Sequence, residues 1–360
     1  MSRYRVAVWS TGGIGTIAVQ TIRRRPDLDL VGVWVHSPAK VGVDAGTLTG
    51  GEPIGLLATS DVDQLIAASP DCIVYAASDG GVSAAAYDDY VRFLEAGINV
   101  VTVTTAGLVY PPAVPQSGKL REAAMRGNAT LYASGIEPGF AGDQLVLTLL
   151  TMSRSVRSVR AQEIFLYDTY PVEFMMREVF GFGQPMSHRP VMSMDGLQQA
   201  IWGPSVEMVA HAMGVTLDAI RETYELDPTP RRLEVACGVI DAGTVGAIRM
   251  ETIGVVDGRD AIIIEHINRM APDLAPHWPN AERDGTYRVV VDGEPSMRCD
   301  LTVGATPDEA PVDGMIATAM RVVNAIPAVC DAKSGLTSSL DLPLTLPRNA
   351  FNLPGYVAER

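Results

Sequence analysis

Short apolar runs alternate with helix-like segments over the first part of the chain. The runs have the length and composition of strands buried on both faces of a parallel sheet, and they lie at Arg5–Trp9, Leu30–Val35, Cys72–Ala77, Asn99–Val103 and Ala129–Ser134. Helices are predicted between them, after Gly13 and over Asp61–Ala68 (N-cap candidates Thr59 and Ser60), Ser83–Ala96 and Ser117–Arg126. Strands separated by helical crossovers predict an α/β domain built from right-handed βαβ units.

The middle of the chain has longer strand-like runs and fewer helices. Turn signals at Asp257-Gly258 and Asp292-Gly293 predict two hairpins. A helical region is expected from Leu197 to Glu225, and strands are expected at Val159–Tyr167, Leu233–Ile240, Val245–Val256, Asp260–Arg269, Tyr287–Val291 and Ser296–Val303. Adjacent hairpins favour a second domain of α+β type with a mainly antiparallel sheet.

A last helix is predicted at Val312–Val329, and its apolar stripe is expected to pack against the first domain. The predicted division is therefore 1–145 for a dinucleotide-binding domain, 146–309 for a substrate and dimerisation domain, and 310–360 for a returning helix and tail. No apolar run approaches the roughly 18–20 residues that cross a bilayer. The N-terminus enters a strand without a secretory signal pattern, so we expect a cytoplasmic protein.

Composition limits the partners. Hydrophobic residues make up 47% of the 360 residues, enough for large buried cores, and 28 basic against 42 acidic residues give a net charge of −14. Nucleic acid and anionic membranes bind basic surfaces, so neither is expected as a partner. An anionic ligand must be held by backbone N–H groups and a few local cations.

The glycine loop after the first strand carries the clearest chemistry. It consists of Ser10, Thr11, Gly12, Gly13, Ile14 and Gly15, a GxGxxG pattern with serine at its first position. In that pattern the middle glycine admits a pyrophosphate and the last lets the helix pack closely on the strand, while the helix N-terminus attracts the phosphates. A tight strand–helix turn without a ligand is the alternative. The position inside an N-terminal βαβ unit favours a Rossmann dinucleotide site.

The residues after the second strand indicate the cofactor. NAD-preferring sites place a carboxylate here to hold the ribose 2′-OH, but this chain has none and offers His36, Ser37 and Lys40 instead. Ser37 can donate to a 2′-phosphate, and His36 and Lys40 can supply charge or stacking. The alternative is a solvated loop. We therefore expect NADP rather than NAD.

Ligands of open α/β sheets lie beyond the carboxyl ends of the strands. Small or polar residues occupy those ends and are expected along the cofactor, namely Ala77, Ser78, Thr104 and Thr105. Glu137 follows the last strand and is the candidate proton donor or acceptor for the carbon–nitrogen or carbon–oxygen group. Its alternative role is that of a helix N-terminal carboxylate.

The second domain supplies further polar candidates for contact with a substrate: Glu163, Tyr167, Asp168, Arg177 and His188. His188 follows the Phe180–Gly183 segment and is the second catalytic candidate. His266, on an apolar strand, is interpreted as a sheet residue with its hydrogen bonds satisfied. The segment Phe174–Met186 contains several Phe and Met residues that either line an apolar substrate pocket or belong to the core.

Several of these segments resemble a known family. They are Trp9–Gly15, Val35–Lys40, Asn99–Pro111, Gly135–Asp143, Val323–Pro327 and Leu336–Pro343. The chain resembles the actinobacterial branch of proteins with a dihydrodipicolinate-reductase-type N-terminal domain, related to 2,4-diaminopentanoate dehydrogenase and the native amine dehydrogenases. The resemblance implies an NADP- or NAD-dependent reductase of C=N or C=O bonds acting on a small molecule, commonly as a homodimer.

Two departures from the family pattern matter. The paired histidines and KxDxPSGT run of dihydrodipicolinate reductase are absent, which argues against that activity. In amine-forming relatives a glutamate follows the NVV strand, roughly where Ala106 and Gly107 stand here. We therefore predict an NADP(H)-dependent oxidoreductase of a small amine, imine or carbonyl in which Glu137 has taken over proton handling. The alternative is a regulatory protein that binds NADP(H) without turnover.

Overall fold

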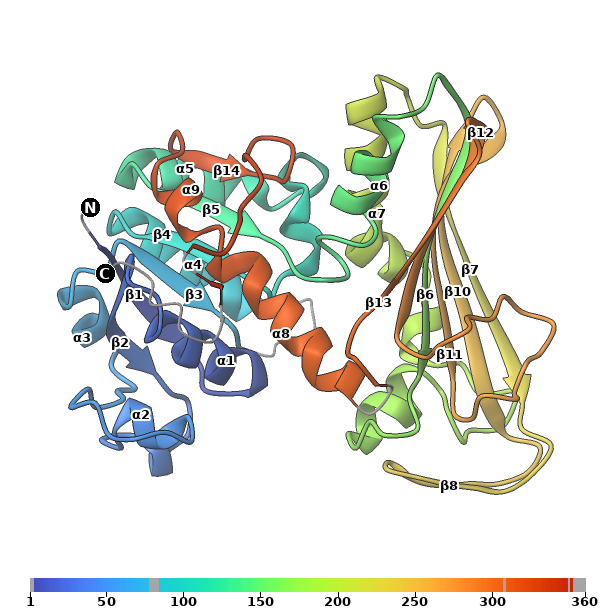
Figure 1. Ribbon diagram of the computed structural model, residues 1–360, viewed down its shortest axis with the longest axis horizontal. Helices are drawn as coiled ribbons and strands as arrows, with labels where there is room; N and C mark the ends of the chain where they lie inside the picture. The colour runs from blue at the N-terminus through green and yellow to red at the C-terminus, as the bar shows by residue number, and fades with distance from the viewer. Residues whose placement is uncertain (1–2, 78–83, 307–308, 349, 352–360) are drawn as a thin grey trace. The chain divides into compact units, whose positions relative to one another are not determined.

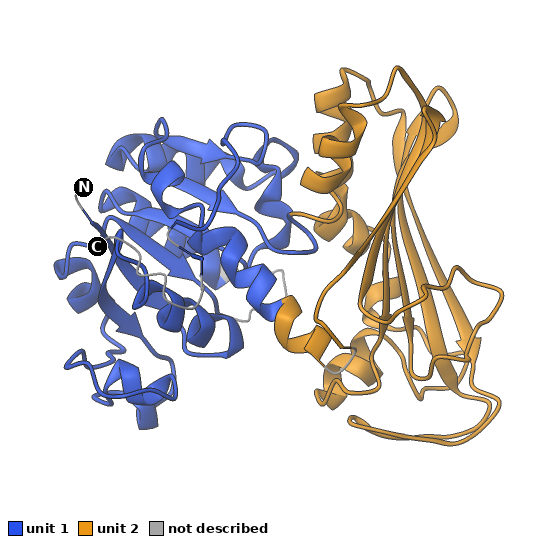
Figure 2. Cartoon of the chain, in the orientation of Figure 1, with its two compact units in different colours: residues 1–139, 315–360 blue, residues 140–314 orange. Residues whose placement is uncertain are grey.

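The chain divides into two compact units. The computed structural model describes residues 3–77, 84–306, 309–348 and 350–351. One unit comprises 1–139 and 315–360, and the other comprises 140–314 (Figure 2). The first boundary precedes the predicted residue 145 because helix α6 (Gln144–Leu150) packs Leu145, Leu147 and Leu149 against the core of the second unit.

The first unit contains a fully parallel six-stranded sheet, which confirms the predicted Rossmann architecture. Its strand order is β14-β5-β4-β3-β1-β2 (Figure 1). The strands are β1 (Tyr4–Trp9), β2 (Leu28–Trp34), β3 (Cys72–Tyr75), β4 (Asn99–Thr102), β5 (Thr130–Ala133) and β14 (Gly335–Thr337). The predictions located the first five strands and missed the short β14.

Helices cover both faces of this sheet, and each face has its own buried apolar cluster. The helices are α1 (Gly13–Ile22), α2 (Ala45–Leu48), α3 (Val62–Ala67), α4 (Ala84–Glu95) and α5 (Ser117–Gly127), with 3-10 turns η1 (Pro38–Lys40), η2 (Ala106–Val109) and η3 (Pro111–Ala113). The cap of α3 is Asp61, whose carboxylate accepts from the backbone N–H groups of Asp63 and Gln64. The predicted caps Thr59 and Ser60 were wrong.

The second unit contains a mixed six-stranded sheet in the order β13-β12-β6-β11-β10-β7. Its strands are β6 (Ser155–Leu166), β7 (Ala219–Pro228), β10 (Val245–Val256), β11 (Arg259–Arg269), β12 (Thr286–Glu294) and β13 (Met297–Thr302). The β6–β11 pair is parallel and the other neighbours are antiparallel, as a mainly antiparallel sheet requires. Other elements are α7 (Leu197–Met213), the π-helical turn η4 (Met175–Val179) and the 3-10 turn η5 (Val191–Ser193).

Two predicted elements of the second unit were wrong. Helix α7 ends at Met213 because Gly214 adopts a left-handed conformation with φ 68°, and residues predicted as helix up to Glu225 instead enter β7. The single strand predicted over Leu233–Ile240 is a hairpin of β8 (Leu233–Val235) and β9 (Gly238–Ile240). The hairpin predicted around Asp292-Gly293 is present, because the pairing of β12 with β13 ends at Val291 and Met297, although β12 itself continues along β6 to Glu294.

The predicted C-terminal helix is divided into α8 (Ala310–Val323) and α9 (Ile326–Cys330). Val322, Val323, Ala325, Ile326 and Val329 are buried in the core of the first unit, as expected. The stretch Ala310–Cys330 is long and apolar enough, by length and composition alone, to cross a membrane. Of an 18-residue segment within it, 39% is buried inside the protein. The expectation that no stretch reaches this length was therefore wrong, although the buried residues are those of a core helix.

A network of ion pairs crosses one face of the second sheet. Its centre is the fully buried Glu265, whose carboxylate accepts hydrogen bonds from Arg160 Nη1 (2.7 Å), Gln162 Nε2 (2.7 Å) and Arg249 Nε (2.6 Å). Burial alone would raise the pKa of Glu265, but the arginines and Gln162 outweigh it and hold that pKa below its usual value. Glu265 is therefore ionised across the neutral range.

Replacing Glu265 tests this network. Glu265→Gln leaves Arg160 and Arg249 without their buried counter-charge and should lower the free energy of unfolding by about 3 kcal/mol, measured by urea denaturation. Because the folded-state pKa is depressed, the contribution is complete above the ordinary carboxyl pKa and disappears as pH falls through the folded-state value. The variant should therefore lose less stability on acidification than the parent protein.

The control is Glu225→Gln, which removes a 46% exposed partner of Arg249 at 3.4 Å and should cost less than about 1 kcal/mol. Equal losses in the two variants would contradict a special role for the buried carboxylate.

Candidate active site

The glycine loop joins β1 directly to α1. Ser10 has φ 89°, a conformation that normally requires glycine, which explains why the usual pattern has glycine at this position. The Ser10 Oγ accepts a hydrogen bond from the backbone N–H of Gly12 at 3.3 Å. This local bond offsets part of the backbone cost of serine there.

Gly15 and Gly12 have the environments that a dinucleotide loop needs. A Cβ on Gly15 would lie 2.1 Å from the carbonyl oxygen of Ser10, so only glycine lets the helix approach the strand so closely. A Cβ on Gly12 would meet nothing nearer than Ser10 Oγ at 3.8 Å, and no side chain caps α1 at Gly12. The N–H groups of the first helical turn can therefore bind an anion, and the loop fits a pyrophosphate.

The predicted 2′-phosphate residues lie beside this loop. The backbone N–H of Ser10 donates to the carbonyl of Trp34 at the end of β2 (2.9 Å), and His36 and Ser37 follow directly. Lys40 Nζ donates to Thr11 Oγ1 at 3.1 Å and thereby brings a cation to the loop. His36 is exposed, with its ring centre 6.2 Å from that of Trp34. Their cofactor role stays a prediction.

Side-chain hydrogen bonds connect the segments that follow β3 and β4. Thr104 Oγ1 donates to the carbonyl of Ala77 at 2.7 Å, and the hydroxyls of Thr105 and Tyr90 are hydrogen-bonded at 2.9 Å. Both threonines are buried. Their side chains therefore organise the strand ends, and contact with a cofactor would involve the backbone. Ser78, the remaining candidate of this group, lies outside the described residues.

Glu137 lies at a small cavity beyond the ends of β4 and β5. The cavity has a volume of about 60 Å³, and Thr105, Ala106, Ser134 and Thr318 also line it. The carboxylate predicted to handle a proton thus shares a cavity with Ala106, the position at which amine-forming relatives were expected to carry glutamate. Sequence reasoning could not establish this proximity, because the two residues come from different strand–helix connections.

The polar candidates of the second unit lie in different surroundings. His188 is half-buried, and its Nε2 has no hydrogen-bond partner among the described residues. Arg177 donates to the carbonyl of Val239 (2.8 Å) and pairs with Glu173 (3.1 Å), and the carbonyl of Asp168 accepts from the N–H of Ala236. Arg177 is therefore part of the local structure, while His188 keeps an unsatisfied nitrogen.

Glu163 and Tyr167 form a cluster with two residues of β11. The Tyr167 hydroxyl donates to Glu163 Oε1 at 3.1 Å, and Asn268 Nδ2 lies 3.4 Å from the same oxygen. His266 is directly paired with Glu163 across the strands, and its ring lies tilted against that of Trp202, with 4.3 Å between the ring centres. Its imidazole makes no hydrogen bond within the described part of the chain, which differs from the satisfied residue that the sequence suggested.

Burial controls the ionisation of this cluster. It raises the pKa of Glu163 to about 6, against the opposing hydrogen bonds of Tyr167 and Asn268, and it lowers the pKa of His266 to about 4. The histidine is therefore neutral at neutral pH. Sequence reasoning missed Asn268, although it and His266 alternate on the same face of β11.

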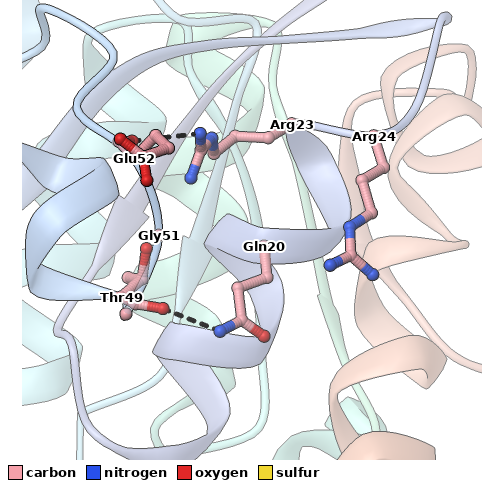
Figure 3. Close-up of a pocket in the computed structure, with 7 residues that line it drawn as sticks. Gln20, Arg23, Arg24, Thr49, Gly51 and Glu52 are labelled. Carbon is pink, nitrogen blue, oxygen red and sulfur yellow. Dashed lines mark hydrogen bonds between the residues drawn. The ribbon is translucent and has the colours of Figure 1, made fainter.

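A larger hollow of about 310 Å³ lies at the other end of α1 (Figure 3). Gln20 Nε2 donates to the carbonyl of Thr49 at 2.7 Å, and Arg23 Nη2 donates to that of Glu52 at 3.3 Å. Because Gln20 lies in the last turn of α1 and Arg23 is its C-cap residue, this hollow is separate from the glycine loop at the N-terminus of the helix.

A parallel sheet with this loop defines the class of dinucleotide-binding oxidoreductase folds. Comparison with known proteins narrows the class. Residues 140–352 match the 2,4-diaminopentanoate dehydrogenase C-terminal domain. An amine dehydrogenase of Streptomyces virginiae is 39% identical over 94% of this chain and 95% of its own length. A 2,4-diaminopentanoate dehydrogenase of Acetoanaerobium sticklandii is 23% identical over 96% of this chain and 94% of its own length.

Solved structures support the same fold. An amine dehydrogenase from Mycobacterium smegmatis superposes with a TM-score of 0.75 at 21% identity, covering 96% of this chain and 98% of that one. A biliverdin reductase from Synechocystis, solved with biliverdin and NADP+, has a TM-score of 0.52 at 16% identity, covering 91% and 90%. The chain belongs to the amine dehydrogenase and 2,4-diaminopentanoate dehydrogenase family of oxidoreductases, which confirms the resemblance seen in its sequence.

Substitutions in the glycine loop test the cofactor site. Gly15→Ala forces a methyl group against the Ser10 carbonyl and should cost at least about 2 kcal/mol in unfolding free energy. It should also weaken NADPH binding at least about tenfold, as measured by fluorescence titration. Ser10→Gly relieves the unfavourable φ but loses the Oγ hydrogen bond, so stability should stay within about 1 kcal/mol and NADPH binding should persist.

Gly118→Ala is the matched control, because a Cβ at this helical position of α5 meets nothing within 4 Å. Unchanged NADPH affinity in Gly15→Ala would show that the loop does not hold the dinucleotide.

Proposed function

We propose that the protein transfers hydride between NADP(H) and the carbon of a small amine, imine or carbonyl, with ammonia as the nitrogen source in the reductive direction. The observation that carries this proposal is the shared cavity of Glu137 and Ala106. Because Glu137 and Ala106 line the same cavity, Glu137 is suited to replace the glutamate that amine-forming relatives were expected to carry near position 106.

The choice of NADP over NAD is supported by the end of β2. Residues 36–40, which follow β2, include no Asp or Glu, so this segment has no carboxylate to repel a 2′-phosphate. Lys40 adds positive charge beside the loop through its bond to Thr11. In a protein of net charge −14, a local cation of this kind is needed to hold a polyanionic ligand.

Each group of the chain has a distinct task in this proposal. The N–H groups at the start of α1 bind the pyrophosphate, and Lys40 and Ser37 bind the 2′-phosphate. The bound cofactor supplies or accepts hydride. Glu137 holds the proton that the nitrogen or oxygen gains on reduction and loses on oxidation. His188 remains the candidate of the second unit for a hydrogen bond to substrate.

The direct test is NADPH oxidation against a panel of aldehydes and ketones, with and without ammonia, followed by absorbance of the reduced nicotinamide. We expect oxidation that depends on ammonia and is faster with NADPH than with NADH at equal concentration. Tight NADPH binding without oxidation across the panel would instead support a regulatory protein that senses the cofactor.

Glu137→Gln tests the proton-handling residue. The amide keeps the shape of the side chain but cannot exchange a proton, so kcat should fall at least about 100-fold while NADPH affinity stays the same. Glu52→Gln, an exposed position at the distant hollow, is the control and should retain full activity. If Glu137→Gln binds NADPH and turns over like the parent protein, Glu137 is not the proton-handling residue.

A further inference from the structure

The Glu163 cluster has an unbalanced charge. The opposite face of the same sheet carries Arg160 and Arg249, but these pair with Glu251 and Glu265. Glu163 lies on the face that carries α7, where the ring of its strand neighbour His266 contacts that of Trp202. No cation pairs with Glu163 among the described residues. A buried carboxylate is normally paired with a cation or neutral. When Glu163 is ionised, a positively charged ligand would therefore stabilise it.

Two acceptor atoms of the cluster, Glu163 Oε2 and Asn268 Oδ1, receive no hydrogen bond from the described residues. Both described donors to Glu163, Tyr167 and Asn268, reach the same oxygen, Oε1. Within the described chain nothing donates to Oε2. Asn268 is fully buried, and its Oδ1 has no donor among the described residues either. Because Asn268 gives its amide nitrogen to the carboxylate, its oxygen requires a donor from a ligand or solvent.

Aromatic rings adjoin the residues of this cluster. Tyr167 contacts Phe180 edge-on at 5.7 Å and Phe182 at 6.3 Å. Phe165, on the same face of β6 as Glu163, lies 5.0 Å from the ring of Tyr287, whose strand position faces Glu163. A carboxylate, an amide oxygen and aromatic faces together suit a primary ammonium group, which offers a positive charge and N–H donors.

We propose that Glu163, Asn268 and Tyr167 form the site on the second unit that binds the ammonium group of an amine ligand. Glu163 Oε2 and Asn268 Oδ1 accept from its N–H groups, and the rings of Tyr167 and Phe180 contact its carbon chain. This assignment rests on the proposed function, because amine turnover would give the ligand its role. Glu163 is a binding residue here and not a catalytic one.

Equilibrium binding tests the site without any turnover. The probe is n-butylammonium, titrated calorimetrically into the full-length protein at pH 8, with n-butanol as the neutral analogue. Glu163→Gln should weaken n-butylammonium binding at least tenfold and leave n-butanol binding unchanged. The control is Glu234→Gln, an exposed carboxylate on β8, which should bind like the parent protein. Parent-like binding by Glu163→Gln, or no binding by the parent protein, would overturn the assignment.

A second probe uses only the unmutated protein and therefore does not depend on the folding of a variant. n-Butyltrimethylammonium has the same charge but no N–H donor, so it should bind at least tenfold more weakly than n-butylammonium. Equal affinity would overturn the assignment. An enzyme that binds n-butylammonium in this way but shows no ammonia-dependent NADPH oxidation would refute the proposed function and leave the ammonium site standing.

Discussion

The close approach of α1 to β1 is the constraint on which the cofactor half of the molecule depends. The carbonyl of Ser10 occupies the space that any side chain at position 15 would need. The same geometry directs the N–H groups of the first helical turn beyond the strand end and holds Ser10 beside the end of β2. One backbone contact thereby places the N–H groups proposed to bind phosphate next to the residues proposed to select the ribose.

The second unit separates its charges by face. On one face the carboxylates of Glu251 and Glu265 are paired with arginines. On the face that carries α7, the donors to Glu163 among the described residues are all uncharged. The buried carboxylates on one face of the sheet are paired with arginines, whereas Glu163 on the other face has no cationic partner among the described residues. This contrast supports a cationic ligand for Glu163.

The sequence predicted most of the first unit because strands buried on both faces are continuous apolar runs, and the glycine loop has a fixed place after the first of them. Prediction was poorer where the signal was ambiguous. Residues of β7 alternate polar and apolar positions, and no proline separates them from α7, so the left-handed Gly214 marks the boundary. Asp292-Gly293 is a dipeptide that favours turns, yet it belongs to β12, because the pairing of β12 with β6 continues to Glu294.

The sequence predicted only part of the candidate site. The glycine loop could be identified because its residues are contiguous, and Glu137 because it follows a strand end. Sequence could not show that Glu137 shares a cavity with Ala106, or that Asn268 reaches Glu163 from a strand about a hundred positions away, since both relationships are created by the folding of distant segments.

Hydride transfer between NADP(H) and the carbon that bears nitrogen can be followed with an isotope. NADPH carrying deuterium at both hydrogen positions of the reactive nicotinamide carbon is supplied to the enzyme with a ketone and ammonia, and the amine formed is analysed by mass spectrometry. If hydride passes to that carbon, the product carries one deuterium on its amine-bearing carbon. Oxidation of the cofactor with no deuterium in an amine product would contradict this transfer.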